Sequence, residues 1–438
     1  MTISRGRGGF DRRVLIKAAG LAAAATTLGA PVVHGQGKKT LRFLNTETSI
    51  DSIRALRVAC AEYERQHGTR VVVDSVPLDD AFTKVTTSLR GGQPYDIATF
   101  AFVGHVLILA SEGQLMPLTE LTSKRQWGPK ILFPIKNEVY WYPYDYNLAW
   151  IYYRKDLYEA KGLTVPKTWT DFLKNAQALN GDGRSGALFP IGSNGATNWL
   201  SPGFMWAEGV KLFDDKWNVV IDNAEMAPKV TRYLDFFADL YKTMPSGSSQ
   251  ASFGEVLSNF ASDKVAHTAY AGRIIEALER TSPALASKYG ITPYMDSAGR
   301  AKAVNHGYDG WVVLKTGNSD EAMKFMAWFT ENHYINFLHT APLHFQPPRL
   351  DVYDDERWRA HPLIEKHKDA VEAMRGFITD KSMILTSIDT EGPEPDLRPG
   401  KVFEAFVVPE MLQNRILKNM SSADALKAAA EKMRKVIA

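Results

Sequence analysis

The sequence predicts an α/β protein built from two lobes. Its 438 residues are too many for one ordinary hydrophobic core and suit two units of typical size. Hydrophobic residues make up 45% of the chain, which is enough to fill two interiors. From residue 40 onward, β-branched segments alternate with segments that have helical spacing of apolar residues. This order is typical of a mostly parallel sheet covered by helices.

The alternation is clearest just after residue 40. Strands are predicted over 41–44, 70–76 and 95–102, and they are separated by helices over 49–68 and 79–92. The first helix begins at a capping Ser or Asp and ends at a glycine, and the second ends at a pair of glycines. Ligands of such sheets bind beyond the carboxyl ends of the strands, so the loops there are candidate site segments.

The central and C-terminal parts continue the α/β pattern. Residues 137–156 are dense in aromatics and predict two strands that are broken at Pro143. A helix is expected to begin within 166–171, with a threonine as its cap. Residues 317–334 and 421–437 have the spacing of two longer helices.

Residues 1–35 predict an export signal of the twin-arginine type. Asp11 to Lys17 contains an arginine pair followed by apolar residues and a lysine, and a short Ala- and Thr-rich run follows. Cleavage is expected after Gly35 or after Ala30. No later stretch reaches about 18 apolar residues, so we expect a soluble, periplasmic protein after signal removal.

Charge and cysteine content exclude several classes of function. The net charge of +3 is concentrated in the first 35 residues, where five basic residues face Asp11 alone, so the rest of the chain is close to neutral. A nucleic-acid partner is therefore not expected. Cys60 is the single cysteine, which rules out an intramolecular disulfide and a cysteine-based zinc site. Its spacing from Leu56 and Tyr63 predicts a core position.

No catalytic motif is present in the sequence. It contains no Gly-x-Ser-x-Gly, His-Glu-x-x-His or Walker loop, and its ten histidines are irregularly spaced. A Gly-x-Gly-x-x-Gly occurs at 181–186, but it opens a loop rich in Gly, Ser and Asn and does not join a strand to a helix, as a dinucleotide-binding motif would. We therefore expect a protein that is not an enzyme and that needs no cofactor or metal ion. Carboxylates are abundant, so a glycosidase pair is not excluded by counting alone.

Four segments in a fixed order carry a family resemblance. They are 91–97 (GGQPYDI), 143–169 with its Tyr-Arg-Lys-Asp and Pro-Lys-Thr-Trp, 260–266 (FASDKVA), and 306–315 followed by a helix and Pro-Pro-Arg. The pattern resembles the bacterial extracellular solute-binding proteins of family 1, the sugar-binding group that is similar to maltose-binding protein. Asp263 stands where that family has glycine.

The resemblance implies a two-lobed type II periplasmic-binding fold with three inter-lobe crossings and a ligand cleft. The crossings are expected near 145–148, 291–295 and 314–317. The N-terminal lobe would then comprise 40–146 plus 294–315. The C-terminal lobe would comprise 147–293 plus 316–438. The implied function is capture of a sugar or oligosaccharide for an ABC importer by lobe closure, with the permease subunits as partners and a monomeric state.

A sugar site needs aromatic rings for the C–H faces and polar side chains for the hydroxyls. Asn45 and Glu47 follow the first strand, where the family places polar ligand contacts, and Phe100 corresponds to a stacking aromatic. Trp206 lies seven positions after Trp199, two helical turns along the same face, and one of the two is expected to stack on ligand. The full set of candidates is Asn45, Glu47, Phe100, Tyr144, Asp145, Asn147, Trp199, Trp206, Tyr270, Arg273, Asp309 and Trp311.

Two other functions stay open at this point. Arg273 stands where the family often has tryptophan, and it favours an anionic solute such as a sugar acid or phosphorylated polyol. Glu47 and Asp145 favour a cationic one such as a polyamine. A secreted carbohydrate-active enzyme is the third hypothesis. His344 and Arg349 lie in a loop that is near the cleft in the family.

Overall fold

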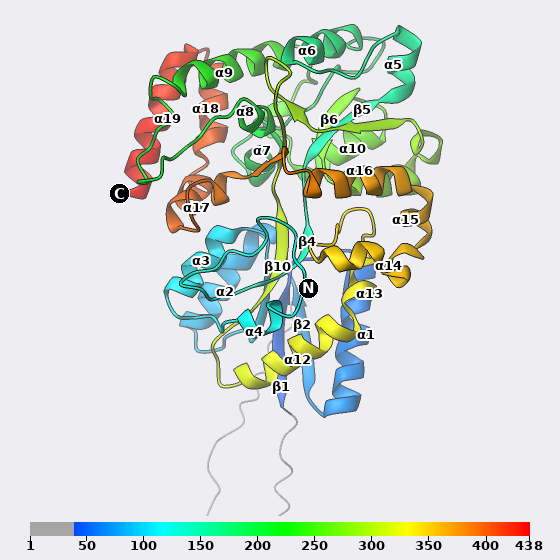
Figure 1. Cartoon of the computed structure of the whole chain (residues 1–438), viewed down its shortest axis with the longest axis vertical. Helices are drawn as coiled ribbons and strands as arrows, with labels where there is room; N and C mark the ends of the chain where they lie inside the picture. The colour runs from blue at the N-terminus through cyan, green and yellow to red at the C-terminus, as the bar shows by residue number, and fades with distance from the viewer. Residues whose placement is uncertain (1–38) are drawn as a thin grey trace, which may run out of the picture. The chain divides into compact units, whose positions relative to one another are not determined.

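The computed structural model describes residues 39–438, and the helices and strands below all belong to this part of the chain (Figure 1). The predicted signal, residues 1–35, lies outside the described residues, as do both of its expected cleavage positions. Within 39–438, no helix is long and apolar enough to cross a membrane.

A five-stranded sheet with the order β2-β1-β3-β10-β4 forms the centre of what we call the first lobe. Strands β1, β2 and β3 are parallel, and β10 runs antiparallel to both β3 and β4. The strands are β1 (Thr40–Asn45), β2 (Arg70–Ser75), β3 (Ile97–Phe100), β4 (Tyr142–Tyr146) and β10 (Tyr308–Val313).

Within the described residues, six helices and one 3₁₀ turn belong to this lobe. The helices are α1 (Ile50–His67), α2 (Ala81–Arg90), α3 (Val103–Ser111), α4 (Thr119–Thr122), α12 (Ser319–Asn332) and α13 (Tyr334–Leu338), with a 3₁₀ turn at Leu78–Asp80. The Ser49 hydroxyl accepts a hydrogen bond from the Ser52 N–H at the start of α1, and Gly68 ends the helix in a left-handed conformation with φ of 75°. Both predicted ends of this helix are confirmed.

Two three-stranded sheets form the centre of the second lobe, with the orders β6-β5-β7 and β11-β9-β8. Strand β5 is antiparallel to both of its neighbours, and β9 pairs in parallel with β11. The strands are β5 (Trp150–Arg154), β6 (His267–Tyr270), β7 (Tyr289–Thr292), β8 (Tyr294–Met295), β9 (Lys302–Asn305) and β11 (Ile384–Thr386).

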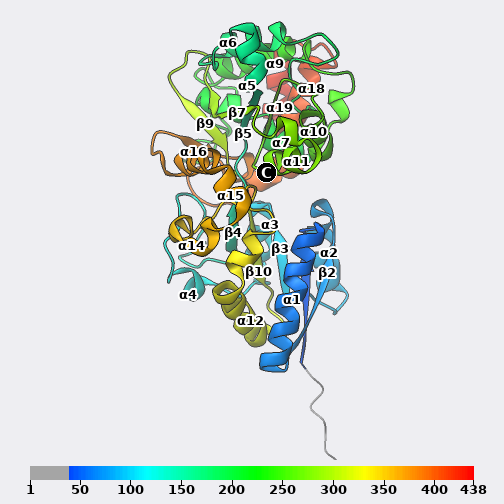
Figure 2. The ribbon, with the colours of Figure 1, turned by 90° about the vertical axis from the view of Figure 1, so that its right-hand side faces the viewer.

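Helices from three stretches of the chain surround these two sheets (Figures 1 and 2). They are α5 (Lys155–Lys161), α6 (Trp169–Ala178), α7 (Gly195–Leu200), α8 (Gly203–Ala207), α9 (Ala227–Tyr241), α10 (Phe253–Ala261), α11 (Arg273–Thr281), α17 (Leu397–Glu404), α18 (Val407–Ile416) and α19 (Ser422–Ile437). The chain returns from α13 to β11 through α14 (Glu356–Arg359), α15 (Pro362–Lys366) and α16 (Lys368–Thr379). The remaining 3₁₀ turns are Ser248–Gln250, Pro283–Leu285, Leu350–Asp354 and Ile388–Thr390.

Several predicted elements are confirmed. The threonine cap of α6 is Thr168, which forms a capping box with Asp171, and Ser421 caps α19. Cys60 is 6% exposed within the core, and burial raises the pKa of its thiol to about 12. The predicted break at Pro143 is wrong, because Pro143 lies inside β4. The sheet tolerates it there because β4 is an edge strand and the register with β10 shifts next to this position.

The sheets also show where the chain passes between lobes. It leaves the first sheet after β4 and enters β5 four residues later, near the expected crossing at 145–148. The chain returns to the first lobe between β9 and β10. From the sequence, the second and third crossings were expected near 291–295 and 314–317. The sheets to which β8, β9 and β10 belong therefore differ from the expected lobes. The sequence assigned 294–315 to the N-terminal lobe and 316–438 to the C-terminal lobe.

Packing explains the difference. Strand β9 pairs with β11, which comes from the C-terminal part of the chain, so β8 and β9 remain in the second lobe. Helix α12 stays with the first sheet because its aromatic side chains are buried there. The Phe325 ring lies 6.4 Å from the Phe43 ring of β1, and the Phe329 ring lies 5.1 Å from the Trp311 ring of β10.

Candidate functional site

A cavity of about 400 Å³ lies between the first and second lobes, beyond the carboxyl ends of β1 and β3. The first lobe lines it with Thr46, Glu47, Thr48, Ser49, Pro77, Leu78, Ala101, Phe102, Tyr308 and Asp309, and His344 lines it from the segment that follows α13. The second lobe contributes Asn198, Trp199, Phe253, Tyr270, Arg273, Ser387, Asp389 and Phe403. Asn147, His306 and Gly307 line it from the segments that connect the two lobes.

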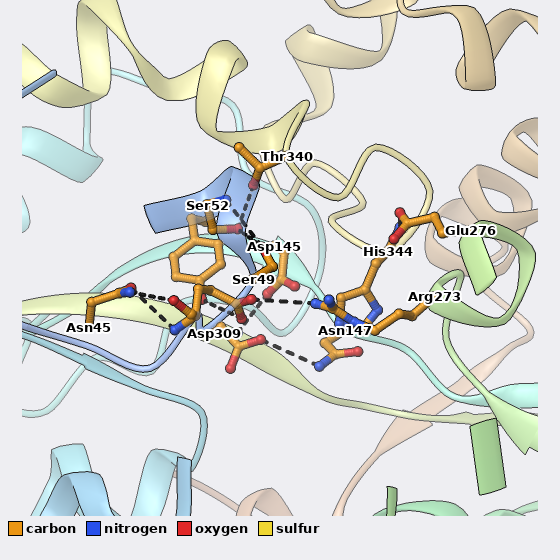
Figure 3. Close-up of polar contacts among 12 residues, drawn as sticks. Asn45, Ser49, Ser52, Asp145, Asn147, Arg273, Glu276, Asp309, Thr340 and His344 are labelled. Atoms are coloured by element: carbon orange, nitrogen blue, oxygen red, sulfur yellow. Dashed lines mark hydrogen bonds and ion pairs between the residues drawn. The ribbon is translucent and has the colours of Figure 1, made fainter. Parts of the chain in front are cut away.

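The structure brings six of the twelve sequence candidates together in this cavity. They are Glu47, Asn147, Trp199, Tyr270, Arg273 and Asp309. The other six do not line it: Asn45, Phe100, Tyr144, Asp145, Trp206 and Trp311. Figure 3 labels three members of the first group, Asn147, Arg273 and Asp309, together with polar neighbours such as Asn45 and Asp145.

Asn45 shapes the first loop of the site. Its side-chain oxygen accepts a hydrogen bond from the Glu47 N–H over 3.2 Å, and its amide group donates to the Glu47 carbonyl. Such local bonds fold the chain back in a tight turn after the strand. Asn45 itself is fully buried, so it positions Glu47 instead of lining the cavity.

An ion pair joins the two lobes at the cavity. The Arg273 guanidinium, at the first residue of α11, lies 3.4 Å from the Glu47 carboxylate. The side chains of Glu47 and Arg273 are 13% and 27% exposed, so the pair is only partly screened by water. The Tyr144 hydroxyl lies 3.5 Å from the other Glu47 oxygen and is buried behind the loop.

Two aspartates face each other on β4 and β10. Asp145 and Asp309 are partners in the strand register, and the Asp309 N–H donates a 2.7 Å hydrogen bond to the Asp145 carboxylate. Asn147 donates to the Asp309 carboxylate over 3.4 Å. Burial, assisted by the nearby Glu47 charge, raises the pKa of Asp309 to about 8. Burial and the adjacent Asp309 also raise the pKa of Asp145, so the two carboxyl groups titrate as a pair, and this pair holds a proton at neutral pH that can be donated in a hydrogen bond.

Several buried polar atoms face the cavity without a partner among residues 39–438. They are Thr46 Oγ1, Asn147 Oδ1, Asn198 Oδ1, Trp199 Nε1, His344 Nδ1 and both ring nitrogens of His306. Buried polar groups are nearly always hydrogen-bonded in folded proteins. This set includes both donors and acceptors, so it suits a solute that offers both kinds of group.

Aromatic rings form the apolar part of the wall. The Trp199 ring lies 5.9 Å from the Phe253 ring and 5.6 Å from the Tyr270 ring, all in the second lobe. The Phe102 ring of the first lobe lies 4.7 Å from the Phe403 ring. Flat rings of this kind accept the C–H faces of sugars and polyols.

The excluded aromatic candidates are core residues. Trp311 is fully buried, with its ring 4.6 Å from that of Tyr144, and Phe100 is 1% exposed beside Phe82. Trp206 does not share a helix face with Trp199, because α7 ends at Leu200 and α8 begins at Gly203. Trp206 instead lines a second cavity of about 480 Å³.

Sequence reasoning missed several lining residues. Phe102 was visible as a residue just beyond a strand, but Phe253, Asp389 and Phe403 carry no local signal that places them at the site. They reach it because α10, the turn at 388–390 and α17 pack around the cavity. Of the two residues noted in the later loop, His344 lines the cavity, whereas Arg349 pairs with Asp351 outside it.

Comparison with known proteins places this site in context. A family model described as bacterial extracellular solute-binding protein matches residues 48–334. The chain belongs to this family. The resemblance stated from the sequence is confirmed, and members of the family are solute-binding proteins and not enzymes.

Curated relatives of this solute-binding protein carry names that refer to polyols and sugars. The mannitol-binding protein of Pseudomonas aeruginosa is 25% identical over 333 residues, covering 71% of this chain and 73% of the relative. The arabinooligosaccharide-binding protein of Halalkalibacterium halodurans is 23% identical over 65% of this chain and 66% of the relative.

Solved structures share the fold. An ABC transporter solute-binding protein of Thermotoga lettingae, bound with α-D-tagatose, aligns with a TM-score of 0.72 at 21% identity, over 91% of this chain and 100% of that protein. A maltose-bound protein of T. maritima aligns with a TM-score of 0.73 at 17% identity, over 91% and 99% of the two chains. The predicted type II periplasmic-binding fold is thereby confirmed.

Proposed function

We propose that this solute-binding protein captures a neutral, polyhydroxylated small molecule, a sugar or a polyol, as the binding subunit of an ABC importer. The observation that carries the proposal is the cavity between the lobes, which combines aromatic rings with unpartnered polar atoms. Sugars and polyols have apolar C–H faces and hydroxyls that both donate and accept hydrogen bonds. The names of the curated relatives agree with this solute class.

The charges at the cavity favour a neutral solute. Glu47 and Arg273 neutralise each other across the lobes, and the raised pKa of Asp309 keeps its carboxyl mostly uncharged at neutral pH. An anionic solute would compete with Glu47 for Arg273, and a cationic solute would compete with Arg273 for Glu47. A charged ligand therefore must displace an existing ion pair, which a neutral ligand does not need to do.

The two carboxyl groups do not favour a glycosidase. Hydrolysis of a glycosidic bond needs one carboxyl group that acts as an acid and a second that is free to act as nucleophile or base. The raised pKa of Asp309 suits it to act as the acid, but Glu47 is held by Arg273 and is not free to act as nucleophile or base. We therefore propose a binding role and no catalytic one.

Capture by closure follows from the distribution of these residues. Glu47 and Asp309 belong to the first lobe, and Trp199 and Arg273 belong to the second, so a solute contacts both sets only when the lobes are together. We propose lobe boundaries at the two passages between sheets, near 147–149 and 306–307, and a third passage between α13 and β11. The same proposal includes export by the N-terminal signal, a periplasmic location, a monomeric state and docking on the permease subunits.

A binding panel tests the proposal. Neutral sugars and polyols should raise the melting temperature of the purified mature protein, because a ligand at 100 times its Kd adds about 2.7 kcal/mol to the free energy of unfolding. Sugar phosphates, sugar acids and polyamines form the charged arm of the panel. Stabilisation by the charged compounds alone, or by none of the compounds, would contradict the proposed function.

A further inference from the structure

A second cavity of about 480 Å³ lies between the two lobes, next to the first. Its wall combines α3 and neighbouring residues of the first lobe with α8, β11 and the loop after β11 from the second lobe. In the described part of the chain, only His306 and Asp389 line both cavities. Glu47, Trp199 and Arg273 line the first cavity alone, so the second cavity is a separate space.

Two buried side chains in this wall have hydrogen-bond donors without partners. Trp206 is 1% exposed, and no group among residues 39–438 accepts the hydrogen on its Nε1. His306 is 2% exposed, and neither of its ring nitrogens has a partner in the same part of the chain. Burial and the nearby Lys130 charge lower the pKa of His306 to about 3, so its ring is neutral and carries one N–H. Buried polar groups are nearly always hydrogen-bonded, so these donors favour a ligand that accepts hydrogen bonds.

Two lysines add further donors to the wall, one from each lobe. Lys130 precedes β4 in the first lobe, and its ammonium donates a 2.9 Å hydrogen bond to the Leu385 carbonyl of β11. An ammonium has three N–H groups, so Lys130 keeps two for a ligand. Lys211 follows α8 in the second lobe, and its ammonium forms no hydrogen bond or ion pair with the described residues.

The acidic residues of the wall do not use these donors. The Asp389 carboxylate accepts hydrogen bonds from a backbone N–H at 3.0 Å and from a serine hydroxyl at 2.7 Å. Glu391 accepts a 3.2 Å hydrogen bond from a backbone N–H, and burial raises its pKa to about 7, so it is only partly charged at neutral pH. Glu394 is exposed to water. The unpartnered groups that remain in the wall are therefore mainly donors.

The rest of the wall is largely apolar. Aliphatic and aromatic side chains from both lobes line it: Val103, Leu107, Leu132, Phe133, Val210 and Ile384. Apolar walls with a few convergent polar groups are typical of small-molecule sites. A sugar or polyol matches this wall poorly, because each hydroxyl needs an acceptor for its own hydrogen.

We propose that the second cavity is a binding site for a small organic acid with an apolar body. The carboxylate of the ligand accepts hydrogen bonds from Lys130, Lys211 and the Trp206 N–H, and its body packs on the apolar residues of the wall. An ionised carboxylate only accepts hydrogen bonds, so it matches a wall whose unpartnered groups are mainly donors. This site is separate from the proposed solute site, and testing it does not require the solute to be known.

Matched probes test the head group and the body of the ligand on the unmodified mature protein. Phenylacetate carries both features, 2-phenylethanol and 2-phenylethylammonium change only the head group, and acetate lacks the ring. Isothermal titration calorimetry at neutral pH should give at least about tenfold tighter binding for phenylacetate than for each of the other three. No binding of phenylacetate, or equal binding of the alcohol or the ammonium compound, would overturn the proposal. Either result would leave the proposed capture of a sugar or polyol standing.

Substitutions in the wall show whether the acid binds there. The double variant Lys130→Gln/Lys211→Gln removes both cations, so phenylacetate should bind at least about tenfold more weakly than to the wild type. Trp206→Phe keeps a ring but removes the N–H, and should weaken binding about threefold or more. Lys216→Gln is the matched control, because Lys216 is an exposed lysine that lines neither cavity.

The variants also distinguish the two cavities. Unchanged phenylacetate binding in the double lysine variant would overturn the proposal. Loss of binding in Arg273→Gln but not in the lysine variants would place the acid in the first cavity, which would also overturn it. If the double variant does not fold, Lys211→Gln alone decides the question, because it keeps the hydrogen bond between Lys130 and Leu385.

Discussion

The Arg273 guanidinium and the Glu47 carboxylate lie 3.4 Å apart and connect two lobes whose sheets share no strand. Glu47 follows the first strand of one sheet, and Arg273 begins a helix that follows β6 of another. The pair therefore exists only while the lobes are together. It links the solute chemistry of the cavity to the relative position of the lobes, and it can be tested without knowing the natural solute.

A double-mutant cycle on this pair should show coupling in ligand affinity. Arg273→Gln alone leaves Glu47 without its cation beside Asp309, so affinity for the solute should fall more than in the double variant Glu47→Gln/Arg273→Gln. We expect a coupling energy of about 1 kcal/mol, since the pair is partly exposed. Calorimetric titration of the wild type, both single variants and the double variant measures this quantity. Strictly additive effects would show that the two residues act independently.

Solute affinity should fall as the pH rises through about 8. Burial raises the pKa of Asp309 from its ordinary value near 3.8 to about 8, so the folded protein holds a proton there that the unfolded chain loses near pH 4. The stability that this proton contributes is fully present below about pH 4 and is lost as the pH approaches 8. Above that pH the Asp309 carboxyl is charged, can no longer donate a hydrogen bond, and lies near Glu47.

The Asp309→Asn variant isolates this effect. It keeps a hydrogen-bond donor and acceptor at the site and removes one of the two carboxyl groups that titrate together, Asp309 and Asp145, so its affinity should decline less between pH 6 and pH 9 than that of the wild type. Glu391, whose pKa burial raises to about 7, lines only the second cavity and is unchanged in this comparison. Parallel pH profiles for the two proteins would assign the dependence to another group.

Trp199 should contribute to solute binding and Trp206 should not. The Trp199 ring borders the first cavity with an unpartnered indole N–H, so Trp199→Ala removes both an apolar face and a donor. We expect the affinity to fall about tenfold or more. Trp206→Phe is the comparison, because Trp206 faces the second cavity. Quenching of Trp fluorescence by solute should persist in Trp206→Phe; its loss there and not in Trp199→Phe would reverse this assignment.

The outcome for these two tryptophans shows what the sequence could predict. Local patterns located β1, α1 and the cap of α6 because those features depend on neighbouring residues. Strand ends likewise pointed to Glu47, and the first lobe crossing pointed to Asn147. The spacing of Trp199 and Trp206 indicated one helix face, but the chain turns between α7 and α8 and sends them to different cavities.

Long-range pairing was beyond the reach of local patterns. Nothing near residues 302–305 indicates that β9 pairs with a strand eighty residues later, yet this pairing keeps β9 in the second lobe. The same limit applies to Asp389 and Phe403, which come to the cavity from the C-terminal part of the chain. The close contact between Gly104 of α3 and Gly400 of α17 joins positions almost three hundred residues apart, and neither segment has a sequence pattern that predicts it.

Asp263 is a position where the sequence departs from the family pattern and the structure explains why. Its backbone is left-handed, with φ of 62°, a conformation that favours the glycine found in the family. Its carboxylate, however, accepts bonds from Arg184 at 2.9 and 2.7 Å and also contacts Arg154, which is 3% exposed. The strain is therefore offset by an ion-pair network that joins Asp263 to Arg184 and to Arg154, the last residue of β5.

Replacing Asp263 should reveal both effects. Asp263→Asn keeps a residue that tolerates the left-handed backbone but removes the charge, and should lower the free energy of unfolding by about 2 kcal/mol because Arg154 is buried. Asp263→Gly loses the same contacts but relieves the backbone by about 1 kcal/mol, so its net loss should be about half as large. Chemical denaturation of the three proteins gives the order. An Asp263→Gly variant as stable as the wild type would show that the network adds nothing beyond the strain it offsets.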